Sequence, residues 1–208
     1  KEVYHVQGGK KLKLSRPQQL MAAEREIIEE AYAGDIIGVF DPGIFSIGDT
    51  LCAPGKKFQF DPIPTFAPEH FRRVRPLDTM KRKQFLKGME QIAQEGAIQI
   101  FKTPYSGMEE VIVGVVGTLQ FDVLDYRLKN EYGVDLYVEG LPYEYLRWVE
   151  HDGDEPLRAD DLILPNDAML VEDYKGNQLL LFASLWSINW TAERNKQLTL
   201  LEFGGAKF

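Results

Sequence analysis

The middle of the chain switches between two hydrophobic periods. Residues 110–116 are almost continuously apolar, as in a buried strand, whereas residues 118–132 place apolar side chains three and four positions apart, as in a helix. The apolar face of that helix consists of Phe121, Leu124 and Leu128. Thr118 is a suitable N-cap residue, and Gly133 suits the left-handed position that ends a helix. The pattern therefore predicts a strand, a helix and a second strand at 134–138.

This unit is part of a longer α+β pattern. From residue 69 onwards the order is strand, helix, strand, strand, helix, strand. We expect the strands at 70–75, 97–102, 110–116 and 134–138, and the helices at 78–95 and 118–132. Two strand–helix–strand halves in this order are typical of ferredoxin-like folds.

A C-terminal extension follows this domain core. Its elements are predicted as a strand at 144–150, an acidic loop, strands at 169–171 and 179–182 joined by a hairpin turn, a helix near 184–195 and a last strand at 198–203. The turn contains Lys175-Gly176-Asn177, residues that suit a tight hairpin.

The first 60 residues show short apolar runs separated by glycine turns, which indicates a small all-β domain. Strands are expected at 3–6, 11–14 and 36–40. Residues 24–32 have the composition of a short helix, with a loop plus a strand as the alternative. Four prolines in residues 54–68 indicate a linker, because proline stiffens the backbone and lacks a donor. We place the boundary near Asp61 and expect domains at 1–61 and 66–208.

Composition narrows the class of protein. The 208 residues are 44% hydrophobic, contain one cysteine, Cys52, and carry a net charge of −8. A single cysteine excludes an internal disulfide framework and fits a reducing, cytoplasmic compartment. No apolar run approaches the ~20 residues that span a bilayer, so no membrane association is expected. The negative net charge argues against binding nucleic acid by bulk attraction, although a local basic patch is compatible with it.

Candidate catalytic and metal-binding groups are sparse. His5, His70 and His151 lie far apart, and Cys52 stands alone, so the spacing of a zinc site is missing. The acidic stretch 151–155 lacks the ligand spacing of an EF-hand loop and is interpreted as a surface loop. No phosphate-binding G-x-x-x-x-G-K-[ST] motif occurs. We therefore expect no catalytic, cofactor or metal site within this chain.

One segment is strongly basic. Between residues 70 and 87 there are seven cations, namely Arg72, Arg73, Arg75, Lys81, Arg82, Lys83 and Lys87. Asp78 is the only acid among them. Three of the cations fall in the first turns of a predicted helix, where the macrodipole disfavours positive charge, and Lys83 and Lys87 repel each other at i,i+4. An anionic partner such as RNA would offset both effects. The alternative is a solvated helix face.

Two tryptophans raise a similar choice. Trp186 and Trp190 stand at i,i+4 on the last predicted helix, and we interpret both as core residues. A stacking platform for bases is the alternative, and it would require both rings to be exposed beside cations, of which Arg194 is one.

The order of residues in the central unit resembles a known family. The residues that carry the resemblance are Gly117, Leu119, Gln120, Phe121, Val123, Arg127, Leu128, Glu131, Tyr132 and Val134. They are similar to a segment in the C-terminal part of the bacterial release factor 3 family, a branch of the translational GTPases. Residues 29–51 resemble the second domain of translational GTPases, a small β-barrel, which favours a loop plus a strand at 24–32. Residues 66–101 resemble the start of the third domain of the same release factors.

The resemblance implies a fold and a function. The fold is a partial translation-factor-type β-barrel followed by a ferredoxin-like domain with a C-terminal extension. The chain would be a C-terminal fragment without the GTPase domain, so GTP and Mg²⁺ would be held outside it. The implied role is to hold a GTP-dependent factor on the ribosome, against rRNA and ribosomal proteins, while class I release factors are recycled. The seven cations are the candidate contacts, and no residue here would be catalytic.

Three further expectations remain. The open edge of a partial barrel exposes unpaired amides, so self-association through residues 1–60 is expected. A fragment of an elongation factor G-like GTPase is one alternative, although that family usually has His where Gln120 stands here. A ribosome-independent protein-interaction module is the other.

Overall fold

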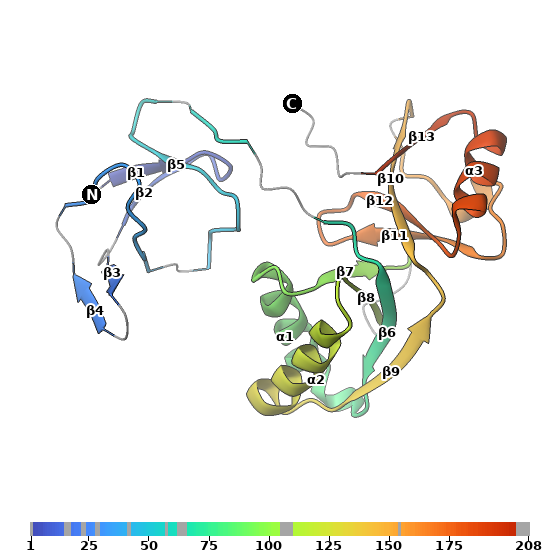
Figure 1. Ribbon diagram of the computed structural model, residues 1–208, viewed down its shortest axis with the longest axis horizontal. Coiled ribbons are helices and arrows are strands. Elements are labelled where there is room, and N and C mark those ends of the chain that lie inside the picture. Colours follow the sequence, from blue (N-terminus) through green and yellow to red (C-terminus); the bar gives the residue numbers. More distant parts are fainter. Residues whose placement is uncertain are drawn as a thin grey trace. The chain divides into compact units, whose positions relative to one another are not determined.

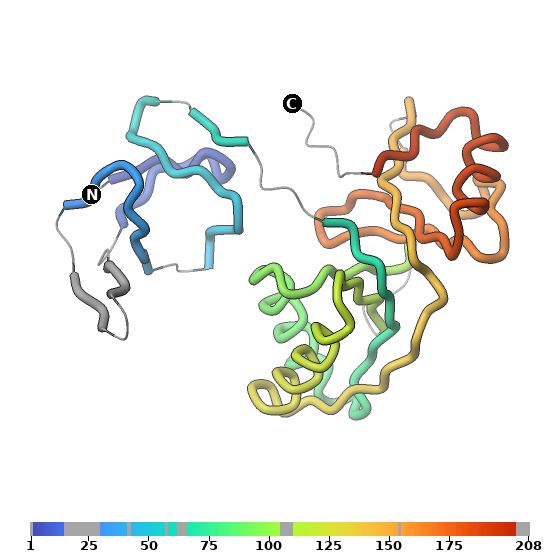
Figure 2. The backbone as a smooth tube through the Cα atoms, in the orientation of Figure 1, coloured from blue at the N-terminus to red at the C-terminus, as the bar shows by residue number. Residues whose placement is uncertain are grey.

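The computed structural model places nearly the whole chain. It describes residues 2–14, 18–21, 24–27, 30–40, 43–56, 58–61, 66–104, 110–153 and 155–202. The chain forms two units, Lys1–Ile63 and Pro64–Phe208, which are described here one at a time. The path of the backbone within each unit can be followed in Figure 2.

Unit one is built from short antiparallel strands. Its strands are β1 (Glu2–His5), β2 (Lys10–Lys13), β3 (Gln18–Met21), β4 (Glu24–Ile27) and β5 (Leu51–Cys52). They pair as a three-stranded sheet in the order β2-β1-β5 and as the hairpin β3-β4. For residues 24–32 the sequence allowed either a short helix or a loop plus a strand. The structure forms strand β4 there, so the second of these predictions is correct.

One strand predicted in unit one is wrong. Residues 36–40 form no strand apart from a single bridging residue at Gly38. The side chain of Ile36 is 87% exposed, and Phe40 is exposed as well. An apolar run becomes a strand only where neighbours pair with its backbone along its length and cover its side chains, whereas this run shows a single bridge and strongly exposed side chains at Ile36 and Phe40.

Unit two begins with the predicted ferredoxin-like order (Figure 1). Its strands are β6 (His70–Pro76), β7 (Gln99–Lys102), β8 (Val111–Val115) and β9 (Leu136–Leu141). Its helical elements are η1 (Thr79–Lys81), α1 (Arg82–Gln94) and α2 (Leu119–Tyr132). These strands are neighbours in the order β7-β8-β6-β9, and all pairs are antiparallel. The mixed α+β fold predicted from the pattern is therefore confirmed.

The C-terminal extension continues the same sheet. It contributes β10 (Tyr145–His151), η2 (Ala159–Asp161), β11 (Ala168–Asp173), β12 (Gln178–Phe182), α3 (Leu185–Arg194) and β13 (Leu198–Leu201). The complete sheet has eight strands in the order β13-β10-β12-β11-β7-β8-β6-β9. The two halves meet where β11 pairs with β7, through the partners Glu172 with Lys102 and Asp173 with Phe101. Residue 203, the predicted end of the last strand, lies outside the described residues.

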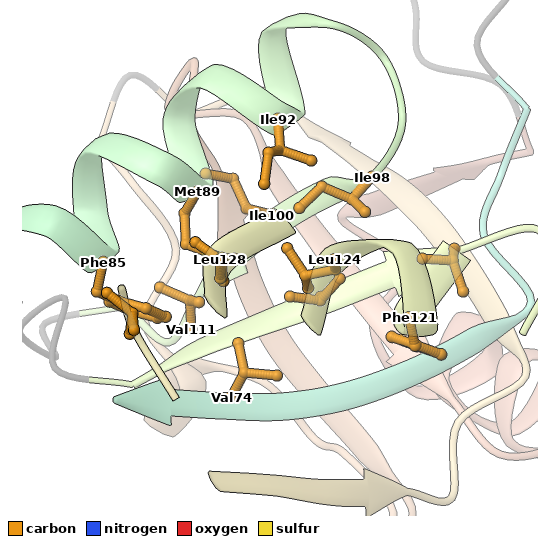
Figure 3. Close-up of a cluster of buried hydrophobic side chains, with 13 residues drawn as sticks. Val74, Phe85, Met89, Ile92, Ile98, Ile100, Val111, Phe121, Leu124 and Leu128 are labelled. Carbon is orange, nitrogen blue, oxygen red and sulfur yellow. The ribbon is translucent and has the colours of Figure 1, made fainter. Parts of the chain in front are cut away.

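Three apolar clusters fill unit two, and strand alternation assigns them to the two faces of the sheet. On β6, Val74 belongs to the cluster beneath α1 and α2, which Figure 3 shows, and Phe71 points to the opposite face. On β12, Leu180 lies beneath α3 and Leu181 joins Phe71 in the second cluster. The helices α1, α2 and α3 thus cover one face, and the other face carries a cluster to which both halves contribute.

Both ends of α2 lie at the predicted residues, Thr118 and Gly133, but the hydrogen bonds at the first end differ from those expected of an N-cap threonine. Gly133 has φ of +66° and ends the helix, as predicted. Thr118 makes no side-chain capping bond. Gln120 acts instead: its Oε1 accepts from the amides of Val116 at 3.0 Å and Gly117 at 2.9 Å, and its Nε2 donates to the Ala97 carbonyl at 2.6 Å. A longer side chain thus satisfies the two amides that precede the helix.

Candidate functional site

The structure divides the basic segment between two faces of the sheet. Successive residues of β6 point to opposite faces. Arg72 lies on the helix-covered face, where its guanidinium carbon stands 4.1 Å from the ring centroid of Phe121. Arg73 and Arg75 lie on the other face. The three arginines therefore do not form one patch with the cations of α1.

Arg73 and Arg75 are matched by local partners. Arg73 Nη1 lies 2.9 Å from Glu139 Oε2, and its Nε lies 3.9 Å from Glu110. Arg75 Nε is 3.7 Å from Glu110, and its guanidinium carbon stands 4.3 Å from the ring centroid of Tyr137. Two glutamates thus offset the charge of two arginines, and this part of the basic segment attracts anions little.

Lys81 has a structural partner. The chain enters α1 through the 3₁₀ turn η1, where the carboxylate of Asp78 accepts from the Met80 amide at 2.9 Å. The Lys81 ammonium reaches across and donates to the carbonyl of Gly133 at the end of α2. A cation is favourable beside the C-terminus of a helix, where unpaired carbonyls gather. Lys81 thus ties the start of one helix to the end of the other.

The exposed cations are those of the first two turns of α1. Arg82, Lys83 and Lys87 are all exposed, and Phe85 and Met89 bury the opposite side of the helix. Within the described part of the chain, the ammonium groups of Lys83 and Lys87 have no ion-pair or hydrogen-bond partner. We call these three residues the α1 cation face. It is narrower than the patch that the sequence predicted.

A charged network that the sequence analysis missed links α1 to α2. Arg127 Nε donates to Glu131 at 2.8 Å, and its Nη2 donates to Glu95 at 3.3 Å. These hydrogen bonds from Arg127 hold the pKa values of both carboxyls below their usual range. Beside them, Tyr132 Oη donates to Gln91 Oε1 at 2.8 Å. The spacing of Arg127 and Glu131 was visible in the sequence, but Glu95 is brought there by tertiary packing.

The interpretation of Trp186 as a core residue is wrong. Its side chain is 63% exposed, and Trp190 is half-buried. The ring centroids of the two tryptophans are 6.1 Å apart, and the Arg194 guanidinium carbon stands 4.0 Å from the ring centroid of Trp190. The buried face of α3 carries Ser187, Ile188 and Thr191 instead. A purely hydrophobic pattern does not identify such a face, because two of these residues are polar.

The described residues form neither a metal-binding cluster nor a membrane-spanning helix. No three or more His, Cys, Asp or Glu side chains there converge in a way that could hold a metal ion. Neither is any described helix both long and apolar enough to span a bilayer.

Comparison with known proteins gives two family matches. Residues 60–192 match the model for the class II release factor RF3 C-terminal domain, and residues 1–54 match the model for elongation factor G domain 2. Several similar curated proteins are called peptide chain release factor 3.

The identities are high over almost the whole chain. One relative, from Symbiobacterium thermophilum, is 51% identical over 197 residues, which is 95% of this chain and 36% of the relative. Another, from Gloeobacter violaceus, is 42% identical over 96% of this chain and 37% of the relative. A third, from Listeria monocytogenes, is 44% identical over 92% of this chain and 35% of the relative. The chain therefore spans about a third of the length of these relatives.

Proposed function

Because the chain belongs to the class II release factor RF3 family, we propose that it is the ribosome-binding C-terminal region of a GTP-dependent release factor that stimulates the recycling of class I release factors. It acts in the bacterial cytoplasm. The release-factor model covers most of unit two, whereas the elongation factor G model matches residues 1–54 only. This distribution favours the release factor over an elongation factor G-like protein.

The observation that carries the proposal within this chain is the α1 cation face. Arg82, Lys83 and Lys87 are exposed on the first two turns of α1, a position that the helix macrodipole disfavours. Two of the three ammonium or guanidinium groups, those of Lys83 and Lys87, have no partner in the described part of the chain. Phosphates of rRNA would supply the missing negative charge, and each contact would release a condensed counterion.

The other four of the seven candidate cations have other roles in this proposal. Arg72, Arg73, Arg75 and Lys81 are held by ring, carboxylate or carbonyl partners within unit two. They stabilise the domain and orient α1 rather than meet RNA. GTP and Mg²⁺ are bound by a part of the factor outside this chain, since no phosphate-loop motif occurs in it. Self-association through residues 1–60 stays a prediction.

The test is a titration of purified ribosomes with the chain at several salt concentrations. Reversing both exposed lysines, Lys83→Glu with Lys87→Glu, should weaken binding and lower the slope of log K against log salt by about 1.4–1.8, since each of the two phosphate contacts contributes about 0.7–0.9. The matched control is Lys175→Glu with Lys196→Glu, which changes the net charge equally at exposed positions far along the chain. Thermal melts monitor folding of both variants.

The outcomes separate the alternatives. Equal weakening by both pairs of substitutions would show a net-charge effect and would contradict a specific role for the α1 cation face. No binding of the unchanged chain to ribosomes would favour the ribosome-independent interaction module.

A further inference from the structure

Helix α3 is fixed in place at its N-terminus by buried polar groups. Ser184 Oγ accepts from the Ser187 amide at 3.2 Å. The fully buried Ser187 hydroxyl then donates to Asp167 Oδ2 at 2.5 Å. These bonds tie the first turn of α3 to the loop before β11, so the residues on its outer side have a defined position.

The C-terminus of α3 is held in the same way. Asn195 is 1% exposed, and its side-chain amide forms two hydrogen bonds to the backbone of Ile163, accepting at 2.9 Å and donating at 2.8 Å. Its Nδ2 also lies 2.8 Å from the Thr191 carbonyl. A helix anchored at both ends loses little conformational freedom when something binds to it.

This anchored helix presents apolar side chains to solvent. Leu185 is 56% exposed and Trp186 is 63% exposed, side by side in the first turn. Trp190 lies between Trp186, whose ring plane is tilted by 40° to its own, and the guanidinium of Arg194, so this row of planar groups ends at the exposed ring of Trp186. We call Leu185, Trp186 and Trp190 the α3 aromatic face. Tryptophan is enriched at the centres of protein interfaces, where few residues dominate affinity.

The net charge of the C-terminal half of unit two, which carries α3, indicates the class of partner. Residues 144–208 contain 12 acids and 6 Lys or Arg residues, a net charge of −6, whereas residues 70–143 contain 10 of each. Three-quarters of the net charge of −8 is therefore concentrated in the half of unit two that carries α3. Such a field repels phosphate and attracts cationic partners.

We propose that the α3 aromatic face docks a basic, arginine-containing segment of a protein partner. An arginine side chain of the partner stacks on the open ring of Trp186 and extends the row formed by Arg194, Trp190 and Trp186. An aliphatic residue of the partner packs on Leu185. Arginine suits the position better than lysine, because its guanidinium is planar and weakly hydrated. This surface is separate from the α1 cation face and does not depend on the proposed ribosome contact.

The test titrates the full chain with three probes: a synthetic peptide that alternates Arg and Leu, the same peptide with Lys for Arg, and single-stranded oligouridylate. Binding is followed by calorimetry and by tryptophan fluorescence. We expect the Arg peptide to bind, the Lys peptide to bind several-fold more weakly, and the oligonucleotide to leave the signal unchanged. Trp186→Ala should reduce affinity for the Arg peptide about tenfold, a larger loss than truncation of most interface residues causes.

A matched control distinguishes docking from general attraction to an acidic surface. Tyr174→Ala removes an aromatic ring that is 66% exposed in the same acidic half of the unit, and it should leave affinity unchanged. Trp186→Phe keeps a stacking surface and should retain intermediate affinity. Equal affinities for the unchanged chain and Trp186→Ala would overturn the proposal. Binding of oligouridylate that depends on Trp186 would overturn it in favour of a base-stacking platform.

Discussion

Gly88 of α1 faces Leu128 and Tyr132 of α2 at short distance, and its substitution by alanine should destabilise unit two. A Cβ atom at Gly88 would lie 2.5 Å from Leu128 Cδ2 and 3.0 Å from two ring atoms of Tyr132. Leu128 is fully buried, and Tyr132 is held by its hydrogen bond to Gln91, so neither side chain can move aside freely. Close packing of the two helices therefore requires a residue without a side chain here.

Two effects of opposite sign set the magnitude. Alanine in place of glycine in a helix interior gains about 0.5–1 kcal/mol. Overpacking a filled core typically costs about 1–3 kcal/mol. Because the contact with Leu128 is shorter than packing allows and those with Tyr132 are tight, we expect the second effect to prevail and Gly88→Ala to lower the free energy of unfolding by about 1–2 kcal/mol. For a protein of this size the melting temperature would fall by roughly 2–8 °C.

The assay is urea unfolding followed by tryptophan fluorescence. All three tryptophans, Trp148, Trp186 and Trp190, lie in unit two, so the signal reports that unit alone. The control is a double-mutant cycle with Leu128→Ala, which by itself should cost about 2–5 kcal/mol. In that background the clash is relieved, and Gly88→Ala should cost less or become stabilising. The argument fails if Gly88→Ala stabilises the unchanged chain, or if its effect is the same in both backgrounds.

Two further predictions concern the ends of the α1–α2 pair. Gln120→Ala should destabilise unit two by about 1–2 kcal/mol in the same urea assay, since two amides and the Ala97 carbonyl lose their partner. Gln120→Glu keeps the acceptor and should cost less, and equal losses would contradict the role given to Oε1. Arg127 lowers the pKa values of the Glu95 and Glu131 carboxyls in the folded chain. The two carboxylates therefore stabilise the fold above the pKa that they have in the unfolded chain, and this stabilisation is lost as pH falls through their lower folded pKa values. Melting temperatures should therefore fall more steeply below pH 4.5 in the unchanged chain than in Arg127→Gln, and parallel pH profiles would refute this.

Sequence periodicity located the elements of unit two because each of its strands and helices buries an apolar face. The same argument failed at residues 36–40, where an apolar run lacks the pairing that would make it a strand. The prediction that Trp186 is a core residue also failed. An i,i+4 spacing indicates that two residues share a face of a helix, but it does not indicate whether that face is buried. The buried face of α3 is held by hydrogen bonds of Ser187 and Asn195, which hydrophobicity does not register.

The candidate site was predicted in part. Lys83 and Lys87 were among the predicted contacts, and both are exposed because Phe85 and Met89 turn the other side of α1 to the core. Strand alternation alone already separates Arg72 from its neighbours on β6. What the sequence could not supply was the partner of each arginine, because Glu139 is brought beside Arg73 only by the pairing of β6 with β9.

The short junction between β7 and β11 has a consequence for synthesis on the ribosome. Lys102 pairs with Glu172, with their charged groups 3.1 Å apart, yet 70 residues separate them along the chain. At typical elongation rates of about 5–20 residues per second, β7 emerges roughly 4–14 s before its partner strand. During that interval the apolar side chains of Phe71, Phe101 and Ile112 are exposed, because β10, β11 and β12, which complete their cluster, have not yet been synthesised. The nascent chain therefore passes through a stage with an open sheet edge and an apolar surface, at which chaperone binding or premature aggregation would compete with completion of the sheet.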